Sequence, residues 1–272
     1  MTARTQYRLV AADLDDTLLT DDLTVTERTK QAMAAAIARG VRLTIATGRM
    51  FASARQIAEQ VGLNVPIITY QGSLIRNLLD GETLYERSVP LEDARKLYDY
   101  TREHGLYLQT FINDRLYAFD EGDKLFAYAK QSAIPYFVEP VFDRLPEGRH
   151  TKLIIIDEPE KLDELLPILQ ARLSDEVHLT KSKPNFLEFV HREGTKGHAL
   201  RFLAAHYGIP MEQTIAIGDA WNDREMIEAA GLGVAMANGV PALRELADYV
   251  TLSNNEDGVA HVLEQFILSR ND

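Results

Sequence analysis

Cysteine is absent from this chain of 272 residues. Its absence excludes disulfide bonds, thiolate nucleophiles, cysteine-ligated zinc and iron–sulfur clusters. Long apolar runs are also missing, and the N-terminus lacks the basic and apolar regions of a signal peptide. Because a membrane-spanning helix needs about 20 consecutive apolar residues, we expect a cytoplasmic protein with no membrane partner.

Positive charge is scarce as well, since 29 Lys and Arg residues stand against 41 Asp and Glu residues, a formal net charge of -12. This field would repel a polyanion, and no run of Lys or Arg offers a local exception, so we expect no nucleic-acid partner. It would attract a cation such as Mg²⁺. The chain also lacks a Gly-x-x-x-x-Gly-Lys-Ser/Thr loop, a Gly-x-Gly-x-x-Gly turn after a strand and a His-Glu-x-x-His pair.

An apolar stretch of strand type near the start of the chain ends in a run of acids, Asp13, Asp15 and Asp16. Side chains alternate along an extended chain, so Asp13 and Asp15 would leave the strand end on the same side. Two carboxylates that close repel each other unless a cation or a proton lies between them. The stretch is therefore a Mg²⁺ site, a nucleophile beside an acid, or a plain acidic turn.

The pattern of helices and strands changes twice along the chain. Residues 26–70 alternate helix and strand at a spacing typical of a parallel sheet with right-handed crossovers, and residues 196–252 return to that style. Between them, two predicted hairpins with turns at 113–114 and 183–185 indicate an antiparallel α+β unit. We predict an α/β protein with a Rossmann-like doubly wound parallel sheet core at residues 1–83 and 191–272, and an inserted α+β domain at 84–190.

Four short stretches lie where strands of such a sheet end or where a neighbouring helix begins, which is the edge at which ligands bind. Each stretch alone is typical of a helix cap, a turn or a surface residue. Together they place acids, a lysine, a hydroxyl group and free helix N-terminal amides at one edge, a set that binds a divalent cation and a phosphate. The stretches are Asp13 with Asp15, Thr47-Gly48-Arg49, Lys196, and Gly218-Asp219 with Asn222-Asp223.

These stretches resemble, in order, the four motifs of the haloacid dehalogenase-like hydrolases. The run from Asp13 to Leu18 resembles the Asp-x-Asp-x-Thr motif, Thr47-Gly48-Arg49 the second motif, Lys196-Gly197 the third, and the run from Gly218 to Asp223 the fourth. The insertion resembles the large α+β cap domain of the Cof-type subfamily, and Pro184–Phe189 shortly before Lys196 strengthens that match. The resemblance covers essentially the whole chain.

The resemblance implies a role for each matching residue. Asp13 would be the nucleophile that takes the phosphoryl group, and Asp15 the general acid for the leaving alcohol and then the base for water. Lys196 would neutralise charge between the Asp13 carboxylate and the phosphate. Mg²⁺ would be held by Asp13, the backbone carbonyl of Asp15, Asp219 and, nearby, Asp223. The phosphate would be held by Thr47, the amides of Gly48 and Leu14, Lys196 and Asn222, with Arg49 a candidate substrate contact.

The implied activity is Mg²⁺-dependent hydrolysis of small phosphorylated metabolites, either sugar phosphates or phosphorylated cofactor precursors, through an aspartyl-phosphate. Two alternatives stay open, namely a phosphomutase with the same chemistry and a non-catalytic sugar-phosphate sensor. Mg²⁺ is the one cofactor we expect, a small phosphate ester the partner, and a monomer or weak homodimer the assembly. Because a general acid must be protonated near neutral pH, neighbouring acids and partial burial should raise the pKa of Asp15.

Two positions depart from the family pattern or stand outside it. The loop after the third strand commonly reads Asn-Gly in the family, whereas here it is Gln71-Gly72. Trp221, the one tryptophan, fills a variable position of the fourth motif, and we expect it to pack in the core rather than against the cap or a substrate. The two hairpin tips, 113–115 and 183–185, are candidates for contact with the substrate.

Overall fold

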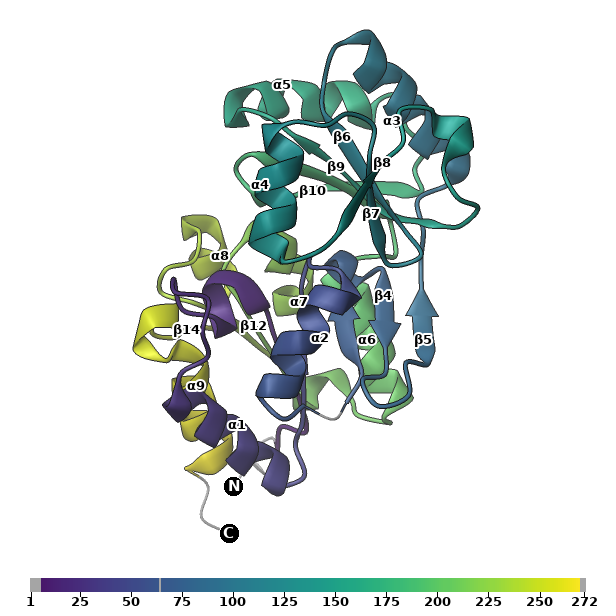
Figure 1. The fold of residues 1–272 in the computed structure, drawn as a ribbon. Coiled ribbons are helices and arrows are strands. Elements are labelled where there is room, and N and C mark those ends of the chain that lie inside the picture. The colour runs from purple at the N-terminus through teal and green to yellow at the C-terminus, as the bar shows by residue number, and fades with distance from the viewer. Residues whose placement is uncertain (1–5, 64, 270–272) are drawn as a thin grey trace.

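The computed structural model describes residues 6–63 and 65–269 (Figure 1). A parallel sheet with helices on both faces forms the lower part of the view, and a second, larger sheet with its own helices lies above it. Of the helices in the described residues, none combines the length and apolar character needed to cross a membrane. The α/β class and the insertion of an α+β cap domain are confirmed.

The parallel sheet has the strand order β14-β13-β12-β1-β2, and a parallel bridge between Ala46 and Ile68 adds β3 beyond β2. Strand order therefore reverses between β1 and β12, so the chain has a topological switch point between these two strands. The strands are β1 (Leu9–Ala12), β2 (Arg42–Ile45), β3 (Ile67–Thr69), β12 (Thr214–Gly218), β13 (Leu232–Ala235) and β14 (Tyr249–Val250).

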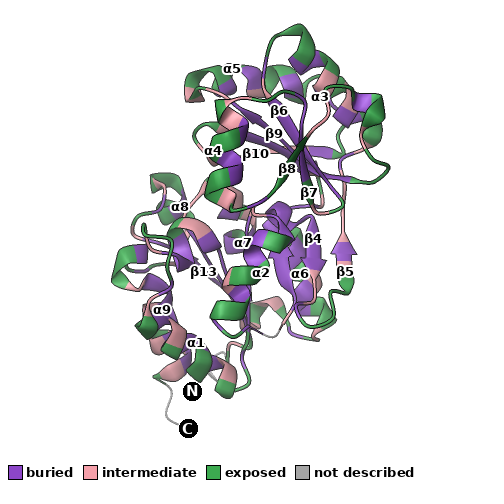
Figure 2. Ribbon diagram, in the orientation of Figure 1, coloured by how far each residue is buried: buried purple, intermediate pink, exposed green. Residues whose placement is uncertain are grey.

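Both faces of this sheet are largely buried, because most residues of its strands are apolar (Figure 2). In β1, Val10 and Ala12 pack with helices on one face, whereas Leu9 and Ala11 pack with helices on the other. The first face is covered by α1 (Glu27–Ala38), α2 (Phe51–Gln60) and α9 (Gly258–Leu263). The second is covered by α6 (Lys196–His206), α7 (Arg224–Ala229) and α8 (Pro241–Leu246).

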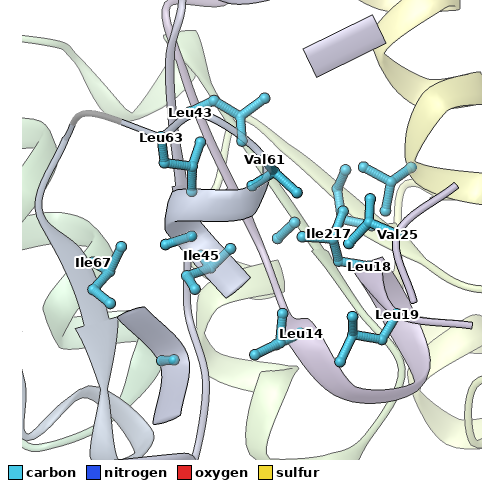
Figure 3. Close-up of a cluster of buried hydrophobic side chains, with 14 of the residues drawn as sticks. Leu14, Leu18, Leu19, Val25, Leu43, Ile45, Val61, Leu63, Ile67 and Ile217 are labelled. Carbon is cyan, nitrogen blue, oxygen red and sulfur yellow. The ribbon is translucent and has the colours of Figure 1, made fainter. Parts of the chain in front are cut away.

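The turn that follows β1 is anchored in this core. Figure 3 shows Leu14, Leu18 and Leu19 among the buried side chains of the first face. Asp16 has a positive φ of 56°, a left-handed conformation that Asp tolerates better than most residues. The turn therefore buries its leucines and leaves its acids at the sheet edge.

The cap sheet has six strands in the order β10-β11-β9-β6-β7-β8. Helices α3 (Leu91–Glu103) and α5 (Pro159–Gln170) pack on one face, and α4 (Asp123–Ser132) lies on the face turned toward the core (Figure 1). The strands are β6 (Leu108–Ile112), β7 (Arg115–Ala118), β8 (Tyr136–Val138), β9 (His150–Ile156), β10 (Val177–Lys183) and β11 (Phe186–His191).

A small antiparallel sheet, β3-β4-β5, lies at the edge of the core, with β4 at Leu74–Arg76 and β5 at Thr83–Glu86. The hairpins predicted around 113–114 and 183–185 are present as β6–β7 and β10–β11. Sequence patterns missed β4 and β8, since three residues are too few to establish an alternation. The division into 1–83 with 191–272 and 84–190 stays a proposal, because β5 and β11 each run across a predicted boundary.

Candidate active site

Three carboxylates meet at the switch point between β1 and β12. Asp13 follows β1, Asp219 follows β12, and Asp223 directly precedes α7. One carboxylate oxygen of each lies within 4.8 Å of the others. The Asp13 amide donates to the Ile217 carbonyl at 2.8 Å, which continues the pairing of the two strands up to the acids. Neighbouring parallel strands thus bring together residues that are more than 200 positions apart.

Lys196 forms ion pairs with two of these acids. It is the first residue of α6, whose N-cap Thr195 accepts a hydrogen bond from the His198 amide. Its Nζ donates to Asp13 Oδ1 at 2.6 Å and to Asp223 Oδ1 at 2.5 Å, and the side chain is fully buried. Burial opposes the charge of Lys196, but the two carboxylates outweigh it and raise the pKa of the ammonium group. Lys196 is therefore a permanent cation at the site.

One lysine does not neutralise three acids. Burial, followed by repulsion from Asp223 and Asp219, holds the pKa of Asp13 well above its ordinary value despite Lys196. Burial and the Asp223 charge raise the pKa of Asp219 to about 7. A divalent cation among these oxygens would remove the repulsion, and carboxylate oxygen is the ligand that Mg²⁺ prefers. The donor set therefore fits a hard metal ion.

Hydrogen bonds fix the two carboxylates that follow β12. Thr17 Oγ1 donates to Asp219 Oδ1 at 2.8 Å, which ties the turn after β1 to the acid after β12. Asp223 Oδ2 accepts the amides of Asp219 and Ala220 at 2.9 and 3.0 Å. Asp223 is fully buried and so orients the loop that carries Asp219.

Asp15 lies outside the group of three acids and pairs with Arg49. Arg49 Nε donates to Oδ2 at 2.9 Å and Nη2 donates to Oδ1 at 2.6 Å, a bidentate ion pair. Burial would raise the pKa of Asp15, but the hydrogen bonds and charge of Arg49 prevail and lower it. The expectation of a raised pKa is therefore wrong for this conformation, because the sequence did not indicate the partner of Asp15.

The loop from Thr47 to Arg49 packs beside that pair. Thr47 is buried, and its Oγ1 accepts the Arg49 amide at 3.1 Å. A Cβ atom at Gly48 would lie 2.4 Å from Nε2 of Gln71, so a larger residue here would displace the Gln71 side chain. Gln71 itself has a positive φ of 63° in the turn after β3.

A buried network of polar side chains from cap and core contacts the Thr47–Arg49 loop. Lys152 Nζ on β9 donates to the Gly48 carbonyl at 2.6 Å and lies 3.4 Å from Glu188 Oε2 on β11. Gln71 Nε2 donates to the same Glu188 oxygen at 2.6 Å, and Asn222 Nδ2 donates to Gln71 Oε1 at 2.9 Å. Asn222 Oδ1 is buried and has no hydrogen-bond partner among the residues that the structure describes.

Sequence analysis did not identify Lys152, Glu188 and Gln71 as site residues. A signal was nevertheless present, since Lys152 directly precedes the apolar run 153–156 and Glu188 interrupts the apolar run 186–190, where an unpaired charge is costly. Opposite charges in two such strands indicate a buried pair, although the sequence alone does not say that these strands are neighbours.

Residues of both core and cap line a cavity of about 70 Å³. Typical small-molecule sites measure about 300–1,000 Å³, so the space between core and cap is too small for a whole ester in this conformation. Of the predicted residues, Asp13, Asp15, Gly48, Arg49, Asp219 and Asn222 line the cavity, whereas Leu14, Thr47, Lys196 and Asp223 lie behind it. The cap contributes Tyr128, Gln131, Ser132, Lys152, Ser182, Lys183, Phe186 and Glu188.

Three further positions are now placed. Lys183, at one hairpin tip, lines the cavity, whereas residues 113–115 at the other tip do not, and Asp114 of that tip contacts the core instead. Trp221 is 51% exposed, so the expectation that it packs in the core is wrong. It lines a surface groove together with His178 and Thr180 of the cap strand β10.

The chain is similar to known proteins over nearly its whole length. The model of a family described as haloacid dehalogenase-like hydrolase matches residues 10–263. A predicted phosphatase of Streptococcus pyogenes is 36% identical, over 96% of this chain and 99% of that protein. The 5-amino-6-(5-phospho-D-ribitylamino)uracil phosphatase YitU of Bacillus subtilis is 31% identical, over 96% and 98%. The crystal structure of TM0651 from Thermotoga maritima is 35% identical, with a TM-score of 0.83 over 98% and 99%.

Proposed function

Because the chain belongs to the haloacid dehalogenase-like hydrolase family, in its Cof-type subfamily, and is a phosphatase of that family, we propose that it hydrolyses small phosphorylated metabolites with Mg²⁺. The observation that supports this most is the convergence of Asp13, Asp219, Asp223 and Lys196 at one sheet edge, beside the Asp15–Arg49 pair. This set joins a nucleophile, a metal site and fixed positive charge, as phosphoryl transfer requires. A cytoplasmic location and a monomeric or weakly dimeric state remain expectations from the sequence.

We assign the first step to Asp13 and Asp15. An Asp13 oxygen attacks phosphorus and forms the aspartyl-phosphate while the bond to the ester oxygen breaks. The leaving oxygen takes a proton from Asp15, which then accepts a proton from the water that attacks the aspartyl-phosphate. The hydrogen bond from Lys196 fixes the rotamer of Asp13 and lowers the repulsion between its carboxylate and the phosphate.

Mg²⁺ would be held by Asp13, the backbone carbonyl of Asp15 and Asp219, with Asp223 supporting the site. It supplies charge neutralisation between the carboxylates and the phosphate. Thr47, the amides of Gly48 and Leu14, Lys196 and Asn222 are the residues we assign to the phosphate. For Asp15 to be protonated in the first step, Arg49 has to give up its two hydrogen bonds, and we assign Arg49 to the arriving substrate.

The cavity favours a polyhydroxylated ester. Gln131, Ser132, Ser182 and Lys183 line it from the cap and offer amide, hydroxyl and ammonium groups. Such groups suit the hydroxyls of a sugar phosphate or of a phosphorylated cofactor precursor. The relative YitU, named for a ribitylamino-uracil phosphate, supports the same class.

The test is a phosphate-release screen over sugar phosphates and phosphorylated cofactor precursors, with and without Mg²⁺. We expect Mg²⁺-dependent release, and a loss of about a thousandfold or more in kcat for Asp13→Asn, which removes the nucleophile. Asp16→Asn, in the same turn but outside the acid group, is the matched control. The proposal fails if the wild type releases phosphate from no ester or if Asp13→Asn is as active as the wild type.

A further inference from the structure

Helix α2 begins two residues after Arg49, but its own sequence supplies no N-terminal capping side chain. The residue before it is Met50, whose side chain makes no capping hydrogen bond among the described residues, and its first turn contains no acid. An N-terminus of this kind leaves amide groups unsatisfied and its positive end uncompensated. The sequence of α2 therefore does not explain why the helix starts where it does.

The capping group for the N-terminus of α2 comes from the inserted domain. Asp114, at the tip of the β6–β7 hairpin, accepts the Phe51 amide at 3.2 Å on Oδ1, and Phe51 is the first residue of α2. The same oxygen accepts the Tyr70 hydroxyl at 2.7 Å, and Arg76 lies 4.0 Å from Oδ2. An ionised Asp at this place satisfies an amide and compensates the helix dipole.

The hairpin turn aims Asp114 at the core. Asn113 and Asp114 have φ values of 51° and 58°, the left-handed pair of a two-residue hairpin turn. The Asn113 side chain donates to the Glu147 carbonyl at 3.1 Å and so stays within the cap. One turn residue therefore braces the hairpin and the next one reaches across to α2.

Tyr70 links this contact to the loop of the active site. Its amide donates to the Arg49 carbonyl at 3.0 Å, while its hydroxyl donates to Asp114. Its buried ring packs edge-on to Phe111 of β6, with centroids 5.4 Å apart. The cap hairpin therefore contacts Phe51 directly and is linked to Arg49 through Tyr70.

We propose that Asp114 is a positioning residue that caps helix α2 from the cap domain, so that closure of the cap orders the Thr47–Arg49 loop. This rests on the proposed function, which gives that loop its role. A 70 Å³ cavity does not admit a whole ester, so the cap has to move away for substrate entry and return afterwards. Asp114 reaches the Phe51 amide only after the cap domain has returned. The N-terminal capping of α2 therefore forms together with the closed site.

Two substitutions at one position separate capping from turn geometry. Asp114→Gly removes the acceptor but keeps the left-handed turn, and Asp114→Asn keeps both an acceptor and the turn. Asn113→Gly is the matched control, since it makes the same kind of change in the adjacent turn residue, whose contact lies within the cap. Urea unfolding of all three variants identifies any general loss of stability.

The first readout needs no substrate. Amide hydrogen exchange in residues 51–54 should be about fivefold faster in Asp114→Gly than in Asn113→Gly, the effect of losing a typical N-cap, with Asp114→Asn close to the wild type. Trp221, beside the cap strand β10, should become more accessible to acrylamide quenching in Asp114→Gly alone. Equal exchange and equal quenching in the Gly variants would overturn the proposal.

The second readout is hydrolysis of p-nitrophenyl phosphate. Asp114→Gly should lower kcat/KM about fivefold or more, Asp114→Asn should restore most of it, and Asn113→Gly should equal the wild type. A wild type without activity would count against the proposed function, yet the exchange and quenching results would still decide the role of Asp114. Normal exchange at residues 51–54 in Asp114→Gly would count against Asp114 whatever the activity.

Discussion

The sequence predicted the position of Arg49 but not its partner, Asp15. The second motif placed Arg49 at the sheet edge, where it lines the cavity. Its bidentate pair with Asp15 joins two loops that are far apart in sequence, and spacing along a chain does not specify such a contact. The same limit applies to Asp15, since a pKa depends on the groups that surround it in space.

Arg49→Lys should lower kcat/KM about tenfold. Lysine is a point charge and does not reproduce the fork of two parallel hydrogen bonds, seen here to Asp15 at 2.9 and 2.6 Å, that Arg49 would offer the arriving substrate. Arg55→Lys is the control, because Arg55 lies in helix α2, which follows Arg49 in the chain, and pairs with Glu59 on its exposed side. Steady-state kinetics of both variants give the measurement, and equal values for the two would contradict the role of Arg49.

His150 is a second residue whose burial has a measurable consequence. It lies at the start of β9, 2.8 Å from Thr110 Oγ1 through Nδ1 and stacked on Phe142, and burial lowers its pKa to about 4. The unfolded chain, with a pKa near 6.5, therefore binds a proton between pH 6.5 and 4 that the folded protein excludes. Stability is full above pH 6.5 and falls by about 3 kcal/mol as pH drops to about 4.

His150→Asn should make the unfolding free energy less dependent on pH over that window. Urea unfolding at pH 7 and pH 4.5 gives the comparison, and His206→Asn, at an exposed site, should behave as the wild type. If His150→Asn loses as much stability as the wild type between the two pH values, protonation of His150 does not contribute.

At the scale of elements, alternation and capping predicted most helices and strands. Thr26 caps α1 by accepting the Thr29 amide, as its position before an alanine-rich run indicates. Helix α2 shows where local reasoning ends, because its cap is Asp114 from another domain. Strands β9 and β11 show the same limit. Their apolar residues are visible in the local sequence, but the pairing of Lys152 with Glu188 depends on the tertiary structure.

Lys152→Met should destabilise the protein by about 3 kcal/mol, because Glu188 then stays buried without its cation. The double variant Lys152→Met/Glu188→Gln should recover most of that loss, since it removes the uncompensated charge as well. Lys161→Met, which breaks the exposed pair with Asp157, is the surface control. Chemical denaturation tests this, and a double variant as unstable as the single one would contradict the argument.

At the scale of the molecule, order of strands explains why the acids meet. After β3 and the short strands β4 and β5, the chain forms the cap domain. It then returns to the core, where β12 pairs with β1. The insertion therefore separates Asp13 from Asp219 in sequence while the sheet keeps them adjacent. The four motifs could predict this edge of the sheet, but not the cap residues above it, which lie outside the motifs and reach the site only through the folding of the cap sheet.

Binding of Mg²⁺ should stabilise the whole chain, because the acid group exists only in the folded state. At a concentration of about 100 times Kd the gain is about 2.7 kcal/mol, which corresponds to a rise in Tm of roughly 5–10 °C for a chain of this size. Asp219→Asn should abolish most of the rise, since it removes one of the three carboxylates that lie within 4.8 Å of one another. Asp16→Asn keeps that group intact and should show the full rise in the same thermal unfolding experiment. Equal rises in the two variants would mean that the cation binds elsewhere on this acidic chain, and Asp219 would then lose its assignment as a metal ligand.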